Sequence, residues 1–284
     1  MTPRSPFVSP LPAAVSARDP GSASGQTASA RARIWALVPC AGSGSRAGGE
    51  LPKQYQSVAG LPMVVHCLNA FGQVPEVAGT LVVISPLDKN FNENNYQNIT
   101  LNSNLFIANC GGNTRHESTY NGIDVLLKKK FEDSDWVMVH DAARCLITPE
   151  QIKRLIDACE NDDVGGLLAL PVPDTLKSAQ DGRVSETVDR AGKWLAQTPQ
   201  MFRIGTLKRA LQLAAAPVTD ESSAIEQLGL KPKLVEGSAQ NFKVTYPADF
   251  ALADAILRLR QGLPTAPAKP TLQTAHLTAN NHHG

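Results

Sequence analysis

A glycine-rich loop flanked by positive charge is the part of this 284-residue chain best equipped for chemistry. An apolar run over residues 34–38 ends at Pro39, and the loop over residues 40–49 contains four glycines. Because glycine has no side chain, the backbone N–H groups of such a loop can approach an anion closely. Arg46 within the loop and Lys53 just after it add positive charge. This pattern predicts a site that binds a polyphosphate and neutralises its charge.

The same loop also matches the dinucleotide-binding pattern G-x-G-x-x-G/A at Gly42, Gly44 and Ala47. A dinucleotide site needs an acidic residue about 20 positions further on, at the end of a second strand. The first acid after the second predicted strand is Asp88, at about twice that spacing. A nicotinamide dinucleotide is therefore disfavoured. A solvated turn with incidental basic residues is the remaining alternative.

A second glycine pair, Gly111 and Gly112, precedes a predicted helix over residues 114–127. Glycines at this place would let a flat base approach the backbone. Arg115 and Ser118 are three positions apart on one helical face, within reach of a base and its ribose. An ordinary capped helix start explains the same residues, and the two interpretations do not exclude each other.

Two further charged residues complete the candidate site. Asp141 follows a predicted strand over residues 136–140, and a carboxylate at the carboxyl end of a strand can bind Mg²⁺ or a ribose hydroxyl. A turn or helix cap is the alternative role for Asp141. Lys243 lies in a predicted strand over residues 241–245. It is either an edge lysine that opposes aggregation or a third phosphate-binding cation. His140 is interpreted as structural, because no second His or Cys stands at metal-ligand spacing.

The elements that must position these residues alternate between strand and helix. Continuous apolar strands separated by amphipathic helices are typical of a mostly parallel sheet that is covered on both faces. The pattern predicts a doubly wound α/β fold of the Rossmann-like kind, with its ligand at the carboxyl ends of the strands. The predicted strands cover residues 34–38, 80–85, 105–108, 136–140, 166–171, 233–236 and 241–245, and the predicted helices cover 63–71, 114–127, 149–160, 205–215, 220–228 and 247–260.

Residues 172–200 interrupt this alternation with polar, turn-prone sequence. The pair Asp181-Gly182 is a hairpin signal between two segments that could form paired strands. The segment therefore predicts a protruding β-arm. Because an extended arm buries little of its own surface, a partner subunit is expected to cover it.

Both ends of the chain differ in composition from the predicted domain over residues 34–262. Residues 1–33 are rich in Ser, Ala, Pro and Arg, and residues 263–284 form a similar low-complexity segment. Both are predicted to be disordered extensions. A transit peptide is the alternative for the first segment, because such peptides share its Arg-rich, acid-poor bias.

Composition excludes several classes of function. Lys and Arg total 27 against 26 Asp and Glu, a formal net charge of +1, whereas nucleic-acid and membrane-surface binding need a large basic excess. No apolar run approaches the roughly 18 residues of a membrane span. The five cysteines are scattered without a C-x-x-C pair, as expected for reduced thiols in a cytoplasmic protein.

Nine short motifs occur in order between about residues 34 and 260, and together they resemble the 2-C-methyl-D-erythritol 4-phosphate cytidylyltransferase family. No single motif is decisive, but their common order makes the resemblance specific. They are Pro39-x-Ala41-Gly42-x-Gly44-x-Arg46, Pro52-Lys53-Gln54-Tyr55, Gly111-Gly112-x-x-Arg115-x-x-Ser118, His140-Asp141-Ala142-Ala143-Arg144, Asp174-Thr175, Thr187-Val188-Asp189-Arg190, Thr198-Pro199-Gln200, Thr219-Asp220-Glu221 and Lys243-Val244-Thr245.

The resemblance implies that residues 34–262 form a nucleotidyltransferase domain. Its substrates would be CTP and 2-C-methyl-D-erythritol 4-phosphate, its products 4-diphosphocytidyl-2-C-methyl-D-erythritol and pyrophosphate, and its cofactor Mg²⁺. The implied catalytic residues are Arg46, Lys53 and Lys243, the CTP-binding residues are Pro39, Ala41, Gly42, Gly44, Gly111, Gly112, Arg115, Ser118, Asp141 and Ala142, the acceptor-binding residues are Asp174, Thr175, Arg190, Thr198 and Thr245, and Asp141 is the candidate metal ligand.

The resemblance also implies a homodimer joined through the β-arm, in which Arg190 reaches the partner's site. Two alternatives stay open. A related enzyme would load another polyol phosphate, such as ribitol 5-phosphate, and a non-catalytic module would bind the nucleotide without reaction. A cytoplasmic location is expected, or a plastid one if residues 1–33 are a transit peptide.

Overall fold

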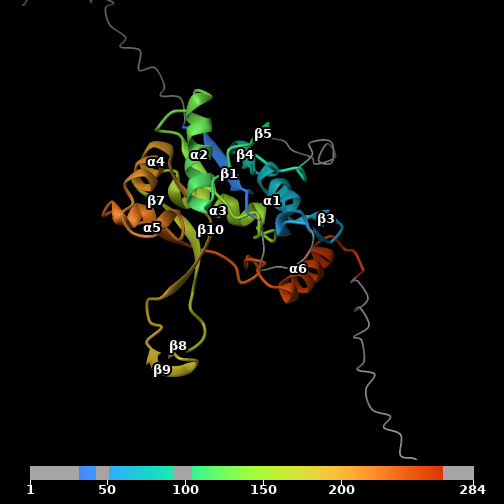
Figure 1. Cartoon of the computed structure of the whole chain (residues 1–284), viewed down its shortest axis with the longest axis vertical. Coiled ribbons are helices and arrows are strands. Elements are labelled where there is room, and N and C mark those ends of the chain that lie inside the picture. The colour runs from blue at the N-terminus through green and yellow to red at the C-terminus, as the bar shows by residue number, and fades with distance from the viewer. Residues whose placement is uncertain (1–31, 43–50, 92–103, 265–284) are drawn as a thin grey trace, which may run out of the picture. The chain divides into compact units, whose positions relative to one another are not determined.

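The computed structural model describes residues 32–42, 51–91 and 104–264, drawn in colour in Figure 1. The predicted loop residues Gly44, Arg46 and Ala47 lie outside these ranges, as does most of both predicted terminal extensions. Within the described ranges, no helix combines the length and the apolar character needed to cross a bilayer.

A seven-stranded sheet forms the centre of the fold, with strand order β11-β7-β10-β6-β1-β4-β5. All its neighbouring strands run parallel except β10, which is antiparallel to both β6 and β7. The predicted α/β class with a mostly parallel sheet is confirmed. The strands are β1 (Ile34–Pro39), β4 (Val77–Val83), β5 (Asn104–Ala108), β6 (Trp136–Val139), β7 (Gly165–Pro171), β10 (Trp194–Arg203) and β11 (Lys233–Glu236).

Helices cover both faces of this sheet, and strand β1 shows why. Its residues Ile34 and Ala36 belong to one buried cluster, and Trp35 and Leu37 belong to another. Because successive side chains of a strand point to opposite faces, a continuous apolar strand needs cover on both sides. The first cluster includes residues of α1 (Met63–Gly72) and α3 (Pro149–Cys159), and the second includes residues of α2 (Arg115–Lys128), α4 (Ile204–Leu213) and α5 (Glu221–Gln227).

The interior strand β10 was not among the predicted strands. Its middle residues Gln197, Thr198, Pro199 and Gln200 have the composition of a loop, and proline is unusual inside a sheet. In the structure, the ladder between β10 and β7 is irregular between Ala196 and Gln200, which accommodates this segment. Residues 194–200 therefore belong to the main sheet and not to the arm.

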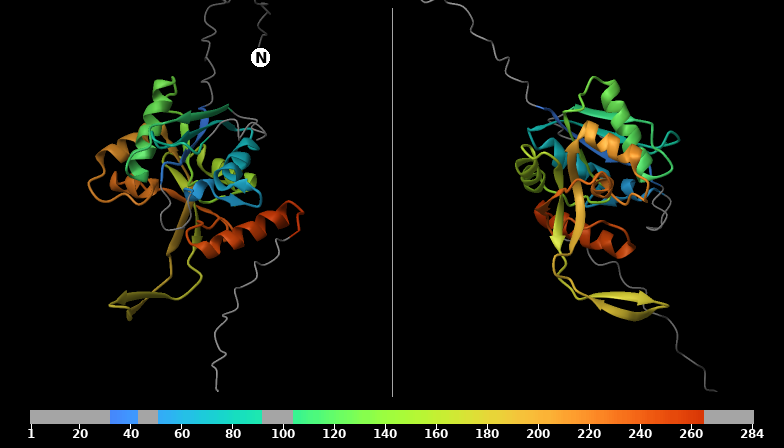
Figure 2. Two further views of the ribbon diagram at one scale, coloured as in Figure 1. Left: turned by 45° about the vertical axis from the view of Figure 1, so that its right-hand side comes forward. Right: turned by 90° about the vertical axis from the view of Figure 1, so that its left-hand side faces the viewer.

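The arm itself is a separate hairpin of β8 (Leu176–Gln180) and β9 (Arg183–Val188). Asp181 and Gly182 form its turn with φ values of 51° and 74°, as the predicted hairpin requires. Figure 2 shows the hairpin standing away from the main sheet.

The predicted strand over residues 241–245 is wrong, because these residues form an irregular connection between β11 and α6 (Pro247–Arg260). The apolar pattern that suggested a strand has another cause. Val244 is fully buried in a cluster with Met63, Leu146 and Leu257, and Phe242 packs against the same cluster. Lys243 lies between them and is exposed.

A small unit formed by η2 (Lys53–Tyr55), β2 (Ser57–Val58) and β3 (Leu61–Pro62) connects the glycine-rich loop to α1. It packs beside α1 and α6. This unit fixes the place of Lys53 relative to the sheet.

Candidate active site

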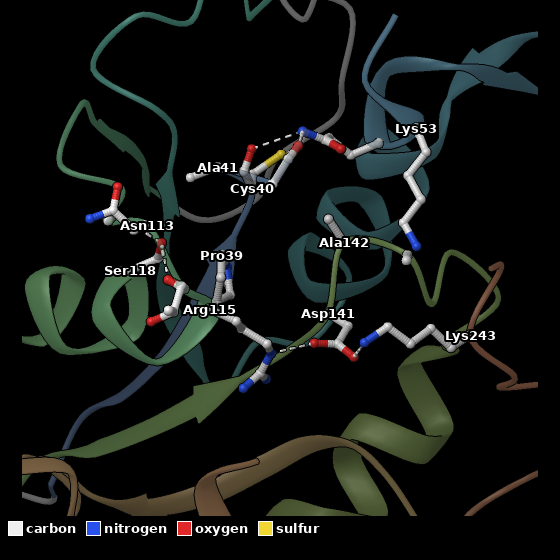
Figure 3. A pocket seen from close by; sticks show the side chains of 15 residues that line it. Pro39, Cys40, Ala41, Lys53, Asn113, Arg115, Ser118, Asp141, Ala142 and Lys243 are labelled. Atoms are coloured by element: carbon white, nitrogen blue, oxygen red, sulfur yellow. Dashed lines mark hydrogen bonds and ion pairs between the residues drawn. The ribbon is translucent and has the colours of Figure 1, made fainter. Parts of the chain in front are cut away.

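A pocket of about 530 Å³ opens at the carboxyl ends of β1 and β6, beside the first turn of α2 (Figure 3). The carboxyl edge of an α/β sheet is where ligands of such folds bind. Its described lining residues are Pro39, Cys40, Ala41, Gly42, Lys53, Gln54, Gly112, Asn113, Thr114, Arg115, Ser118, Asp141, Ala142, Ala143 and Lys243.

The start of the glycine-rich loop is held by a buried glutamine that sequence reasoning did not select. The Gln54 Nε2 group donates to the carbonyl of Cys40 at 3.0 Å and to that of Gly42 at 2.8 Å. Because both carbonyls point toward Gln54, the loop leaves β1 in a defined direction. Gln54 belongs to the Pro52-Lys53-Gln54-Tyr55 motif, but it was not among the predicted site residues.

In the second glycine pair, Gly111 packs against Ala41 at the start of this loop, and Gly112 lines the pocket. Gly111 donates from its N–H to the Ile84 carbonyl at 2.8 Å, and a Cβ added at Gly111 would collide with the Cβ of Ala41. Gly112 donates from its N–H to the Ser118 hydroxyl at 3.1 Å. The close packing explains the need for glycine at position 111.

The first turn of α2 confirms the predicted helix cap. The Thr114 hydroxyl accepts from the Glu117 N–H at 3.0 Å, and the Glu117 carboxylate accepts from the Asn113 N–H at 2.8 Å. Ser118 donates to the Thr114 carbonyl at 2.9 Å while it accepts from Gly112. The capping interactions and the pocket wall are therefore made by the same residues.

Asp141 is surrounded by cations. Its Oδ1 accepts from Arg115 Nε at 2.7 Å, its Oδ2 lies 2.9 Å from Lys243 Nζ, and Arg144 Nε lies 3.7 Å from Oδ2. Burial alone would raise the pKa of this carboxyl, but Arg115, Lys243 and Arg144 hold the pKa well below its usual range. Asp141 is therefore ionised at neutral pH.

Lys53 and Lys243 approach the same pocket from distant parts of the chain (Figure 3). Lys53 Nζ donates to the carbonyl of Val244, the residue next to Lys243, at 3.0 Å. The structure thus brings together two of the three predicted catalytic cations. The third, Arg46, lies outside the described residues.

His140 has the structural role that was predicted. Thr198 Oγ1 accepts from the Asp141 N–H at 3.0 Å. Because the Arg144 carbonyl beside His140 Nε2 can only accept, the neutral ring has its proton on Nε2, and the Thr198 hydroxyl donates to His140 Nδ1 at 3.0 Å. His140 Nε2 then donates to the Arg144 carbonyl at 3.2 Å. Burial lowers the pKa of His140 to about 4, so the ring is neutral and fixes the turn that carries Asp141.

The predicted acceptor-binding residues do not line this pocket of a single chain. Asp174 and Thr175 are exposed where the arm begins, and Arg190 is exposed at its end, where its guanidinium donates to the Pro173 carbonyl. Their role toward an acceptor stays a prediction.

Thr198 and Thr245 lie closer to the site but are engaged in the fold. Thr198 is buried between Asp141 and His140, as described above. The Thr245 hydroxyl donates to the Lys243 carbonyl at 3.0 Å. Contact of either side chain with a substrate also stays a prediction.

Comparison with known proteins places the chain among nucleotidyltransferases. The family model described as "2-C-methyl-D-erythritol 4-phosphate cytidylyltransferase" matches residues 34–259. A protein of that name from Cupriavidus pinatubonensis is 51% identical over 236 residues, which cover 79% of this chain and 94% of the relative. A crystal structure of 4-diphosphocytidyl-2C-methyl-D-erythritol synthase is similar with a TM-score of 0.70 and 40% identity, and the match covers 80% of this chain and 99% of that one.

A longer relative is also similar. The "Bifunctional enzyme IspD/IspF" of Albidiferax ferrireducens is 60% identical over 235 residues, which cover 83% of this chain. The chain spans 55% of the length of this bifunctional relative.

Proposed function

The chain belongs to the 2-C-methyl-D-erythritol 4-phosphate cytidylyltransferase family, and we propose that the pocket beside Asp141 is where it transfers CMP from CTP to 2-C-methyl-D-erythritol 4-phosphate. The products are 4-diphosphocytidyl-2-C-methyl-D-erythritol and pyrophosphate, a step of non-mevalonate isoprenoid biosynthesis. The observation that carries this proposal is the convergence of Lys53 and Lys243 on one pocket whose walls are two glycine-containing loops.

The reaction needs two anions to meet. An oxygen of the acceptor phosphate attacks the α-phosphorus of CTP in line, and pyrophosphate leaves as the bond to it breaks. Negative charge accumulates on the oxygens around phosphorus, so catalysis consists mainly of positioning and electrostatic stabilisation. Lys53 and Lys243, with Arg46 as the third cation, would supply that positive charge.

The pocket fits a mechanism without a protein nucleophile. Cys40 is the one thiol that lines the described part of the pocket, and burial raises its pKa to about 12. A protonated, buried thiol is a poor nucleophile. Direct attack by the acceptor phosphate, as proposed, needs no contribution from this thiol.

The nucleotide is proposed to bind with its base near the second glycine pair. Gly112, Asn113 and Ser118 line this side of the pocket, where Figure 3 labels Asn113 and Ser118. Gly111, also predicted to bind CTP, packs against Ala41 and does not line the pocket. The triphosphate would then extend across Ala41 and Gly42 toward the lysines. This arrangement places the α-phosphate between the two glycine loops.

Magnesium fits the pocket as an ion held largely by the nucleotide. Among the described lining residues Asp141 is the only carboxylate, and the described residues contain no cluster of three or more acidic, His or Cys ligands. Mg²⁺ is commonly held by one or two carboxylates together with substrate phosphates. Because an ionised carboxylate has about four lone-pair sites, Asp141 would supply one oxygen ligand beside its contacts with Arg115 and Lys243. The bound ion would neutralise charge on the triphosphate.

The acceptor is proposed to reach the pocket through a homodimer. The arm residues Asp174, Thr175 and Arg190 are exposed, and the hairpin stands away from its own sheet (Figure 2). A partner's arm could therefore bring such residues to this site. We further propose that the enzyme acts in the cytoplasm.

The experiment that tests the proposed function is a pyrophosphate-release assay with CTP, Mg²⁺ and separate polyol phosphates. Release with 2-C-methyl-D-erythritol 4-phosphate, and little with ribitol 5-phosphate, is expected. Preference for ribitol 5-phosphate would reassign the acceptor. Binding of CTP without release from any acceptor would indicate a non-catalytic module.

A further inference from the structure

Glu221 is a buried carboxylate that does not line the pocket but contacts one of its walls. It is the first residue of α5, and its side chain is 1% exposed. Its Oε1 accepts from Arg115 Nη1 at 2.7 Å, and its Oε2 accepts from Arg115 Nη2 at 2.9 Å. Such a two-point contact fixes the plane of a guanidinium as well as its position.

The same guanidinium holds the pocket carboxylate by its remaining edge. Arg115 Nε donates to Asp141 Oδ1 at 2.7 Å, and Asp141 Oδ2 faces Lys243 (Figure 3). The chain of contacts therefore runs from Glu221 through Arg115 and Asp141 to a predicted catalytic lysine. Rotation of the guanidinium would turn the Asp141 carboxylate and move the ammonium that it holds.

The backbone beneath Glu221 is itself fixed to the sheet. The Asp220 side chain caps α5 by accepting from the Ser223 N–H at 3.0 Å and accepts from Gln200 Nε2 at 2.8 Å. The Ser222 N–H donates to Gln200 Oε1 at 2.7 Å. Since Gln200 belongs to the interior strand β10, the Glu221 carboxylate has a rigid support.

Charge explains why an acid is needed at position 221. Arg115, Arg144 and Lys243 surround Asp141, and Glu221 supplies the second negative charge next to Arg115. Burial alone would lower the pKa of Arg115, but Glu221 and Asp141 raise it above the ordinary value. Without Glu221, Arg115 would have an unpaired end beside a pocket that receives a triphosphate.

We propose that Glu221 is a positioning residue for CMP transfer, which holds Arg115 on Asp141 and keeps that arginine away from the phosphates of the nucleotide. The inference rests on the proposed function, because it concerns the same pocket. Loss of the Glu221 charge would let Arg115 turn toward the triphosphate. The nucleotide would then bind as well as before or more tightly, but with Asp141 and Lys243 displaced from their reactive arrangement.

The test is Glu221→Gln, which keeps the shape of the side chain and removes its charge. Displacement of reacting groups by a distance on the order of 1 Å can cost about 100-fold in rate. We expect kcat to fall by about 10- to 100-fold while the KM for CTP is unchanged or lower. A merely structural role would instead lower the thermal midpoint and leave kcat of the folded fraction unchanged, which would overturn the proposal.

Asp135→Asn is the matched control. Asp135 is also a buried carboxylate paired with an arginine, Arg33 at 2.6 Å, but it lies at the opposite end of β6. It should lower stability without changing kcat or the KM for CTP. If Asp135→Asn and Glu221→Gln lowered kcat equally, the loss would result from removing any buried ion pair, and the proposal would be overturned.

Glu221→Asp keeps the proposal testable if Glu221→Gln does not fold. It retains the charge, but its carboxylate is one methylene shorter and reaches Arg115 less well, so a severalfold fall in kcat without a rise in the KM for CTP is expected. Unchanged kcat in the variant that folds would overturn the inference alone. Inactivity of the wild-type chain with every acceptor would instead overturn the proposed function.

Discussion

Acid should destabilise this protein through one buried histidine. His140 is fully buried, accepts a hydrogen bond from Thr198 at Nδ1 and donates from Nε2 to the Arg144 carbonyl. A protonated ring could no longer accept from Thr198, and the cost of its desolvation, with the charges of Arg144 and Arg115, outweighs its attraction to Asp141. The folded state therefore favours the neutral ring.

The size and sign of the effect follow from the pKa. Burial lowers the pKa of His140 from its ordinary value of 6.5 to about 4. The unfolded chain therefore binds more protons than the folded chain between these two pH values, and stability falls as the pH falls. Since one pH unit of difference corresponds to about 1.36 kcal/mol, the whole contribution is roughly 3.4 kcal/mol, and most of it is lost by pH 4. It is fully present above pH 6.5.

The assay is urea denaturation of the wild type and His140→Gln between pH 7.5 and 4.5. The variant lacks the titrating ring, so the difference in unfolding free energy between the two proteins should shrink by about 2 to 3 kcal/mol as the pH falls. Asp141 does not confuse this range, because its pKa lies below its ordinary value of 3.8. Parallel stability curves for the two proteins would refute the reasoning.

Three further predictions concern the pocket and the arm. Lys243→Ala should lower kcat by about 100-fold or more, with a much smaller effect on CTP affinity. The control Lys208→Ala removes a lysine–carboxylate pair of 2.7 Å and should leave kcat unchanged. A change of KM alone in Lys243→Ala would contradict the proposed role of Lys243. Arg190→Ala should raise the KM for the acceptor, and mixing it with the Lys243→Ala protein should restore part of the activity if the arm acts across a dimer; no recovery counts against that exchange. Gly111→Ala should lower the free energy of unfolding by about 1–3 kcal/mol, because its Cβ would collide with the Cβ of Ala41 and the carbonyl of Ile84, and urea denaturation showing unchanged stability would disprove this.

Local patterns predicted much of the fold correctly. The hairpin turn at Asp181 and Gly182 has the expected positive φ values, and the final helix spans residues 247–260 as expected. Turn chemistry and helical periodicity depend on neighbours in the sequence, so the sequence states them directly.

The two errors have a common physical cause. Strand β10 was missed because its central residues are polar. Residues 241–245 were assigned to a strand because polar and apolar residues alternate along them. In the first segment, buried glutamine and threonine side chains find hydrogen-bond partners on other elements, such as Asn241 and Asp220. In the second, Val244 is buried against helices. The polarity of a segment does not say which other elements pack against it or supply its hydrogen-bond partners.

The sequence by itself determined the glycine loops, the types and order of the charged residues, and through them the family. Only the tertiary structure decided which charges meet. Lys53 reaches the carbonyl of Val244 across 191 positions, and Arg115 is held between Asp141 and Glu221, 26 and 106 positions away. Such pairings depend on the packing of helices and strands around a common sheet edge, and no periodicity within a single segment encodes them.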